Sequence, residues 1–238
     1  MYISDRAWTR YIELLRNVNE TAAKEMHKYL ATHEWFVSPQ AKRDAVDFAA
    51  ALAEKYGEAA SAAACEFYDI IATEWAAGVL PPAVPANTAK YGEVAKSMYG
   101  AMNYTDNIEY IASVVGRMVK MAGVDTTMQN AIRDGAEWAW IPHGETCAFC
   151  LTLASRGWQP ASKAAMKNGH AEHIHSNCDC TYCVRFDRDS YVEGYNPDKY
   201  LRMYYDAPLD GQRATPKNRI NAMRRQAYAQ TGSEEIEV

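Results

Sequence analysis

The fold is decided first by residues 4–32, which read SDRAWTRYIELLRNVNETAAKEMHKYLAT. Apolar residues recur along this stretch at steps of three and four positions. These residues are Trp8, Tyr11, Ile12, Leu15, Val18, Ala22, Met26, Tyr29 and Leu30. Because an α-helix turns about once every 3.6 residues, this spacing collects them on one face. The stretch therefore predicts an amphipathic helix with one buried side.

Further helices are expected toward the C-terminus. Ser38-Pro39 predicts a helix start, because serine suits the N-cap and proline suits the first helical position. An apolar face over residues 45–53 continues this helix, and we expect Tyr56-Gly57 to interrupt or end it. A second apolar run, over residues 63–75, is expected to end near Gly78.

A proline-rich segment is the clearest candidate boundary in the chain. Pro81, Pro82 and Pro85 lie close together, and prolines at this density break regular structure. Beyond them the apolar spacing predicts helices over residues 91–102, 107–122 and 126–140. Asp106 and Asp125 are expected to cap the second and third of these helices.

Composition excludes several classes of protein. The chain has 238 residues, of which 48% are apolar and 23% charged, which predicts a folded chain with a buried core. A net charge of −5 argues against a polyanion binder acting through its whole surface. No apolar run approaches the roughly 20 residues of a membrane span, so no membrane partner is expected. The N-terminus lacks the features of a secretory signal, so we expect synthesis in a reducing cytosol.

The cysteines are unevenly placed, because five of the six lie between Cys147 and Cys183. Clustered thiols in a reducing compartment favour metal binding over disulfides. Cys147-Ala148-Phe149-Cys150 is a pair that a tight turn can aim at two corners of a tetrahedron. His175 and Cys178 can complete a Cys₃His set. Since four protein ligands leave no open position, the predicted cofactor is a structural zinc ion.

The chain offers more candidate ligands than one tetrahedral site needs. Cys178 and Cys180 compete for the fourth position. The predicted metal ligands are therefore drawn from Cys147, Cys150, His175, Cys178 and Cys180. The main rival is a Cys₄ site built from Cys147, Cys150, Cys180 and Cys183. His170 and His173 are further candidates, although exposed histidines explain them equally well.

Two functional alternatives compete with a purely structural role. A catalytic site would need an open metal position or a free thiol, and His143 and Glu145 near Cys147 are weak evidence for one. We therefore expect no enzymatic activity, and the leading enzymatic alternative is a metal-dependent, HNH-like nuclease using His173 and His175. That alternative lacks the usual Asp-His-Ile-x-Pro type of catalytic stretch.

The other alternative is a DNA-binding zinc module. Its local support is a basic stretch without intervening acids, made of Arg213, Lys217, Arg219, Arg224 and Arg225. Such a stretch can follow phosphates, with an affinity that falls as salt rises. A solvated helix face is the competing explanation of the same residues.

The motif Cys147-x-x-Cys150 followed by His175-x-Asn177-Cys178-x-Cys180 resembles that of Mu F-like phage head morphogenesis proteins, the minor capsid proteins of tailed phages. Residues 147–157, CAFCLTLASRG, are similar to the form found in minor capsid proteins of actinobacterial phages and prophages. Tyr56-Gly57-Glu58-Ala59-Ala60 leading to Phe67-Tyr68-Asp69 is similar to the helical half of that group. The resemblance covers residues 1–186.

The resemblance implies a structural or assembly role in the phage head, at few copies near the portal vertex. The implied partners are the portal and the major capsid protein, with packaged DNA as a further partner through the basic stretch. The implied location is the virion head, with the host cytoplasm during assembly. The motif carries over Cys147, Cys150, His175 and Cys178 as matched positions, and Cys180 matches a more variable one. Cys183 departs from the family pattern, which keeps the Cys₄ alternative open.

The expected fold class is mainly α, with an N-terminal helical bundle and a small C-terminal α+β zinc-binding module. The expected organisation is a helical region at 1–80, a second helical region at 81–140, the zinc-binding module at 141–186, and an irregular tail with a basic helix at 187–238. A short strand is expected at residues 181–186.

Overall fold

The computed structural model describes residues 2–3, 5–143, 146–164 and 180–234. The chain divides into two compact units. The first contains Met1–Glu137, Pro160–Asn177 and Val184–Glu193, and the second contains Trp138–Gln159, Cys178–Cys183 and Gly194–Val238. The path of the chain therefore passes more than once from one unit to the other.

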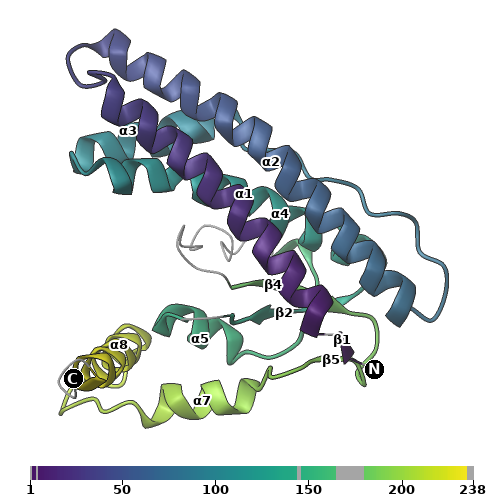
Figure 1. Ribbon diagram of the computed structural model, residues 1–238. Coiled ribbons are helices and arrows are strands. Elements are labelled where there is room, and N and C mark those ends of the chain that lie inside the picture. Colours follow the sequence, from purple (N-terminus) through teal and green to yellow (C-terminus); the bar gives the residue numbers. More distant parts are fainter. Residues whose placement is uncertain (1, 4, 144–145, 165–179, 235–238) are drawn as a thin grey trace. The chain divides into compact units, whose positions relative to one another are not determined.

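The first unit is built on a four-helix bundle (Figure 1). Its helices are α1 (Asp5–Thr32), α2 (Pro39–Trp75), α3 (Tyr91–Tyr104) and α4 (Ile108–Asp134). Helices α1, α2 and α4 all pack against one another, and α3 packs on α2 and α4. A short parallel pair of strands, β1 (Tyr2–Ile3) and β5 (Tyr191–Val192), belongs to the same unit. The predicted class, mainly α with an N-terminal helical bundle, is confirmed.

Helix α1 buries the apolar face that its sequence predicts. Seven of the apolar residues of this face are buried, namely Trp8, Tyr11, Ile12, Leu15, Ala22, Met26 and Leu30. The ring of Tyr11 stacks on Phe67 of α2 with the ring centroids 4.3 Å apart. Aromatic and aliphatic side chains thus join α1 to α2, and the hydrophobic effect holds the two helices together.

Helix α2 begins as predicted but does not break where a break was expected. Ser38 is its N-cap, and the Ser38 Oγ accepts a hydrogen bond from the Ala41 backbone N–H at 3.0 Å. The predicted interruption at Tyr56-Gly57 is wrong, because α2 continues to Trp75. A Cβ atom added to Gly57 would lie 2.9 Å from Cγ2 of Thr88. The glycine therefore makes room for a neighbouring loop and does not end the helix.

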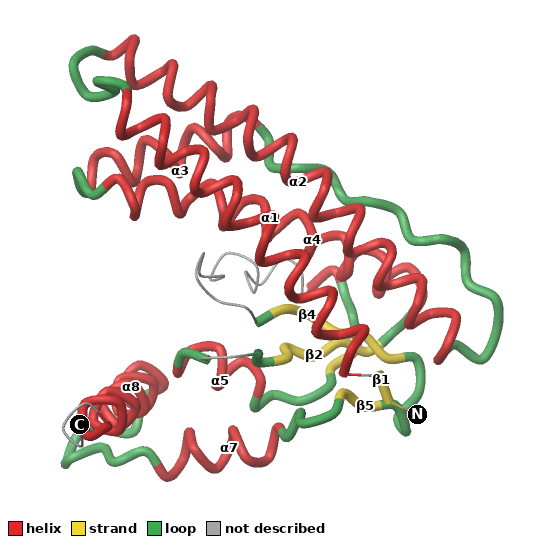
Figure 2. Tube along the Cα trace, in the orientation of Figure 1, coloured by secondary structure: helices red, strands yellow, loops and turns green. Residues whose placement is uncertain are grey.

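The prolines lie in a long loop, residues 76–90, that connects α2 to α3 (Figure 2). Asn130 of α4 holds this loop by two hydrogen bonds of 2.9 Å. Its Oδ1 accepts from the Val84 N–H, and its Nδ2 donates to the Val84 carbonyl. The helices on both sides of the loop pack in one bundle. The predicted division of the helical part at residue 80 stays a prediction.

Helix α4 runs unbroken through the position where a new helix start was predicted. Asn107, not the predicted Asp106, is its N-cap, and the Asn107 Oδ1 accepts from the N–H groups of Glu109 and Tyr110 at 2.9 and 3.1 Å. The predicted cap Asp125 lies inside the helix. Asparagine and aspartate are both good N-cap residues, so the choice between neighbours depends on the local backbone.

The helix predicted over residues 126–140 is wrong in its second half. Helix α4 ends at Asp134, and Gly135 follows in the left-handed region with a φ of 68°. Strand β2 then covers Glu137–Ile141. A residue without a Cβ adopts this φ at little cost, so the glycine turns the chain from helix to strand.

A three-stranded sheet carries the strands in the order β3-β2-β4. Strand β3 is Gln159–Pro160 and β4 is Thr181–Arg185, which confirms the predicted strand. Tyr182 of β4 lies between two tryptophans of β2, with centroid distances of 4.6 Å to Trp138 and 4.9 Å to Trp140. These aromatic pairs join the neighbouring strands.

The described residues of the second unit form three helices, α5 (Ala148–Ala154), α7 (Pro197–Asp206) and α8 (Pro216–Glu234). They pack around a small apolar cluster of Ala148, Ala207, Ala222 and Met223. Helix α7 lies where no regular element was expected. Its start carries a recognisable signal, because Asn196 caps it through the Lys199 N–H at 3.0 Å and a proline occupies its first turn.

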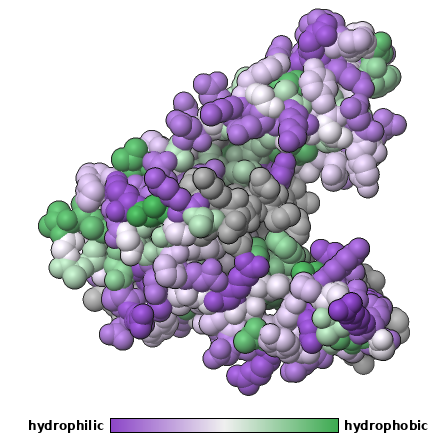
Figure 3. Space-filling model, turned by 180° about the vertical axis from the view of Figure 1, so that it is seen from behind, coloured by the Kyte–Doolittle hydropathy of each residue, from purple (hydrophilic) through white to green (hydrophobic). Residues whose placement is uncertain are grey.

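Hydrophobic side chains are scattered on the face shown in Figure 3, among more numerous hydrophilic ones. Large apolar side chains that are strongly exposed include Phe36, Val37, Val79 and Tyr104. Among the helices in the described part of the chain, none is long and apolar enough to cross a bilayer.

Candidate functional site

The candidate metal ligands Cys147 and Cys150 lie at the start of α5. Cys147 is the N-cap of this helix, and Cys150 lies in its first turn. Cys150 is buried and Cys147 is half-buried. Helix α5 begins at Ala148, between the two cysteines, and ends at Ala154. One tight turn of backbone thus holds both thiols at the same end of α5.

A third candidate ligand, Cys180, reaches this turn from a distant part of the sequence. Cys180 lies directly before β4, fully buried, and its Sγ donates to the Thr146 Oγ1 at 3.7 Å. Because Thr146 precedes Cys147, this contact places Cys180 beside the start of α5. Burial raises the pKa of Tyr200 on α7, and the negative charge of a Cys180 thiolate would raise it further.

Cys183 has a different setting, inside strand β4. It is fully buried, and it follows Tyr182, whose ring packs on the β2 tryptophans. Successive side chains of a strand point to opposite faces. Cys183 therefore lies on the face of β4 opposite to Tyr182. The Cys₄ alternative, which needs both Cys180 and Cys183, stays a prediction.

The remaining candidate ligands, His175 and Cys178, lie outside the described residues. His170, His173 and Glu145, which the alternatives invoke, lie outside them too. Within the described ranges, no group of three or more His, Cys, Asp or Glu side chains has an arrangement that could hold a metal ion. The zinc ion and its ligand set stay a prediction, since two of the five candidate ligands are not described.

Cys65 is separate from this cluster and lies half-buried in α2. Burial and the neighbouring Asp69 raise the pKa of its thiol. A thiol that stays protonated at neutral pH is a poor metal ligand and a poor nucleophile. In this setting Cys65 packs as a small apolar residue.

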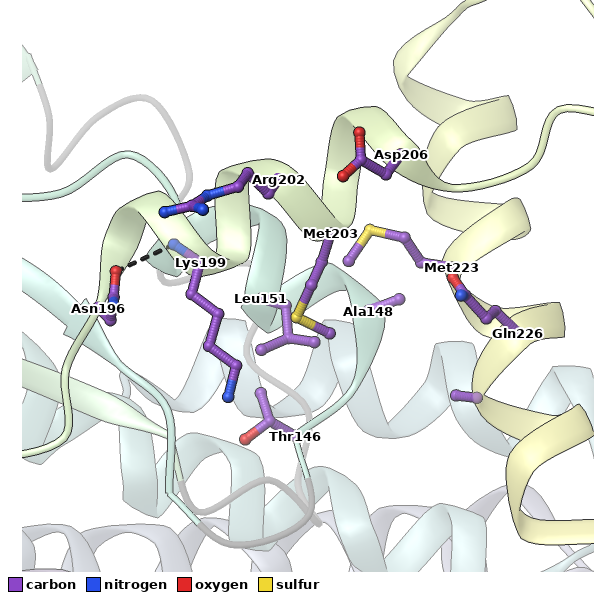
Figure 4. Close-up of a pocket in the computed structure, with 11 residues that line it drawn as sticks. Thr146, Ala148, Leu151, Asn196, Lys199, Arg202, Met203, Asp206, Met223 and Gln226 are labelled. Atoms are coloured by element: carbon purple, nitrogen blue, oxygen red, sulfur yellow. Dashed lines mark hydrogen bonds between the residues drawn. The ribbon is translucent and has the colours of Figure 1, made fainter.

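A groove beside the cysteine turn was not expected from the sequence (Figure 4). It has a volume of about 640 Å³ and lies among α5, α7 and α8 of the second unit. Its apolar part is formed by Ala148, Leu151, Met203 and Met223, and Lys199, Arg202 and Asp206 lie along α7. Sequence reasoning missed the groove because it missed α7, whose start signal at Asn196-Pro197 was available.

The basic stretch lies on α8 and the segment before it, and part of it is engaged within the protein. The Arg219 guanidinium donates to the carbonyl oxygens of Tyr205 at 2.9 Å and Tyr204 at 3.4 Å. The Arg225 guanidinium donates to the carboxylate of Asp210 at 3.4 Å. The other three cations, Arg213, Lys217 and Arg224, are exposed.

Comparison with known families relates the chain to phage proteins. Residues 2–207 match the family described as VG15 protein. The chain belongs to the VG15 protein family. This VG15-family protein is 28% identical over 154 residues to the "Gene 15 protein" of Mycobacterium phage D29, an alignment that covers 47% of this chain and 56% of that relative. The chain thus spans about half the length of the curated relative it matches. No solved structure matches the chain.

Proposed function

We propose that this VG15-family protein is a non-catalytic structural or assembly protein of a tailed-phage head, a minor capsid protein with a structural zinc ion. The head role is supported by the family match over most of the chain and by the similarity to a phage protein. The resemblance of the cysteine motif to Mu F-like head morphogenesis proteins supports the same role. The portal and the major capsid protein are the proposed partners.

The single observation that carries the zinc part is the contact between Cys180 and Thr146. This contact brings a buried thiol beside the turn that holds Cys147 and Cys150. Thiols are preferred zinc ligands, and the pair at the start of α5 would supply two of the four ligands that a structural site needs. We propose Cys147, Cys150, His175 and Cys178 as ligands, with Cys180 as the competitor for the fourth position. The zinc would contribute folding free energy to a segment with little core of its own.

Metal content tests the zinc proposal directly. Elemental mass spectrometry on the purified chain should find one zinc per chain, which is lost in Cys147→Ser and kept in Cys183→Ser. Loss in both variants would move the site to the Cys₄ set. Protein that folds and contains no zinc would refute this part of the proposal.

The head role needs a separate test. Quantitative mass spectrometry of gradient-purified phage heads should find the protein at a few copies per head, far fewer than the major capsid protein. Heads assembled without it should be malformed or fewer in number. Its absence from purified heads, together with normal assembly when the gene is deleted, would refute the head role even if zinc is present.

Contact with packaged DNA is a further proposal, and it has narrower support than the sequence suggested. Arg213, Lys217 and Arg224 are exposed and can contact phosphates, whereas Arg219 and Arg225 are engaged within the second unit. The nuclease alternative depends on His173 and His175, which lie outside the described residues. Divalent-metal-dependent DNA cleavage that is lost in His175→Ala would replace the structural proposal with this alternative.

A further inference from the structure

The groove among α5, α7 and α8 combines an adaptable apolar floor with charges arranged along one helix. Met223 is buried, Leu151 is half-buried, and Met203 is 41% exposed although it lies on the groove side of α7. Figure 4 shows Met203 extending from α7 toward Leu151 of α5. Methionine side chains are flexible and polarisable, so such a floor can adapt to a partner's apolar side chains.

The charges of the groove are ordered along α7. Lys199 and Arg202 lie one turn apart, and Asp206 lies one further turn toward the end of the helix. All three side chains are exposed. Among the described residues, no ion pair neutralises either Lys199 or Arg202. The groove therefore presents two uncompensated positive charges at one end, beside an apolar centre.

Helices form most of the lining of the groove. They are α5, α7 and α8, and the lining residues of α7 extend from Lys199 to Asp206 of this helix of 10 residues. An apolar groove between helices binds an amphipathic helix through side chains spaced by one turn. Flanking charges then select the partner and its direction, because opposite charges attract and like charges repel.

We propose that this groove is a docking site for an amphipathic helix of a partner protein that carries acidic side chains at one end of its apolar face. The acidic end lies against Lys199 and Arg202, and the apolar side chains enter between Met203 and Met223. The inference goes beyond the proposed function and does not depend on a place in the phage head. It identifies a surface and the chemistry of the segment that fits it.

The probe is a fluorescein-labelled synthetic helical peptide of about three turns, with a leucine-rich face and glutamates at one end. Its counterpart carries lysines in place of the glutamates. Fluorescence anisotropy with the full chain should show binding of the acidic peptide at least roughly tenfold tighter than binding of the lysine peptide. The double variant Lys199→Glu/Arg202→Glu should reverse this preference.

A matched pair of α7 substitutions tests the apolar floor. Met203→Gln should weaken binding of the acidic peptide by roughly tenfold. Leu201→Gln should leave it unchanged, because Leu201 has a similar exposure of 38%, lies on the same helix and does not line the groove. The NMR signals of labelled methyl groups of Met203 and Met223 should shift when the peptide is added to the unmodified chain. Because this measurement needs no substitution, an effect of a substitution on folding cannot explain the result.

Several outcomes would overturn the proposal. They are equal affinity for the two peptides, an equal effect of Leu201→Gln and Met203→Gln, and methyl signals that do not move at saturating acidic peptide. Displacement of the peptide by single-stranded DNA, with methyl shifts for DNA alone, would show instead that the groove binds nucleic acid. Circular dichroism of each variant should match the unmodified chain.

Discussion

The guanidinium of Arg219 on α8 donates a hydrogen bond of 2.9 Å to the carbonyl oxygen of Tyr205, at the last turn of α7. The last carbonyl groups of a helix have no partners within it, so a cation placed there satisfies and stabilises them. The same guanidinium lies 5.1 Å from the ring centroid of Tyr205 and 5.5 Å from that of Tyr204. Arg219, which the sequence suggests as a DNA contact, thus connects two helices within the protein.

Replacing this arginine should loosen α7. Arg219→Ala should destabilise the docking of α7 and α8 by about 1 kcal/mol, because it removes the carbonyl contacts and the cation–π contact. Hydrogen exchange over residues 197–206 should become faster. Lys217→Ala, an exposed cation on the same helix, is the control and should leave exchange unchanged. If hydrogen exchange over α7 were equally slow in Arg219→Ala and Lys217→Ala, Arg219 would not be stabilising the end of α7.

The cysteine turn should be required for folding of the C-terminal module. Cys150→Ser should remove zinc and make the chain after residue 147 sensitive to protease, because a short segment with a small core depends on its metal. The helical content before Trp140 should be largely kept. Cys65→Ala should change neither metal content nor protease resistance. A Cys150→Ser variant with full resistance after residue 147 would show that the site has no structural role.

Asp125 should make the bundle less stable as the pH rises. Burial, and then the negative charge of Glu93, raises the pKa of this carboxyl to about 6. The unfolded value is about 3.9, so between about pH 4 and 6 the native state binds more protons than the unfolded state. The free energy of unfolding therefore falls as the pH rises through this window, by on the order of 2 kcal/mol for this group.

The substitution Asp125→Asn isolates this effect. The variant should be more stable than the parent chain at pH 8, and the difference should disappear near pH 4. Urea unfolding at several pH values measures it. Asp106→Asn removes an exposed charge from the loop before α4 and controls for net charge. If the Asp125→Asn advantage were the same at pH 4 and pH 8, ionisation of Asp125 would not be its cause.

Asn130 should hold the proline-rich loop on the bundle. Asn130→Ala should cost about 2 kcal/mol, because it leaves both polar groups of the Val84 backbone without their side-chain partner. Proteolytic cleavage within residues 76–90 should become faster. Gln129→Ala, an exposed neighbour on α4, should change neither quantity. Unchanged loop cleavage in Asn130→Ala would contradict the role of this residue.

DNA binding, if present, should depend on the three exposed cations. Replacing Arg213, Lys217 and Arg224 together by alanine should remove most of the affinity for DNA at low salt and flatten its salt dependence. Truncation at Asp210 is a poorer test, because it also removes Arg219 and Met223, which pack in the second unit. Binding that survives the triple substitution would place any DNA contact elsewhere.

The features predicted correctly from the sequence are those that depend on interactions between residues close together in the chain. The spacing of Trp8, Tyr11 and Leu15 predicts α1, because a helix repeats over a few residues. Ser38-Pro39 predicts the start of α2, because a cap is formed by residues three positions apart. The cysteine pair at 147 and 150 predicts a tight turn for the same reason.

The features that the sequence alone left open or misplaced depend on residues far apart in the chain. Gly57 suggests a helix end, yet α2 continues because the glycine accommodates Thr88 from the proline-rich loop. The helix predicted over residues 126–140 includes residues 137–140, yet these form most of β2, a strand that packs its tryptophans on Tyr182. Short apolar runs are compatible with either structure, so the partner available in three dimensions makes the choice.

The sequence by itself determined that this protein is mainly helical, with its thiols concentrated after the helices. Only the tertiary structure decided that Cys180 meets the turn of Cys147, that Arg219 is used inside the protein, and that α7 completes a groove with α5 and α8. The physical reason is the distance along the chain over which each kind of interaction acts. Helix periodicity and capping act within a few residues, whereas side-chain burial and hydrogen bonding between elements depend on how the whole chain folds.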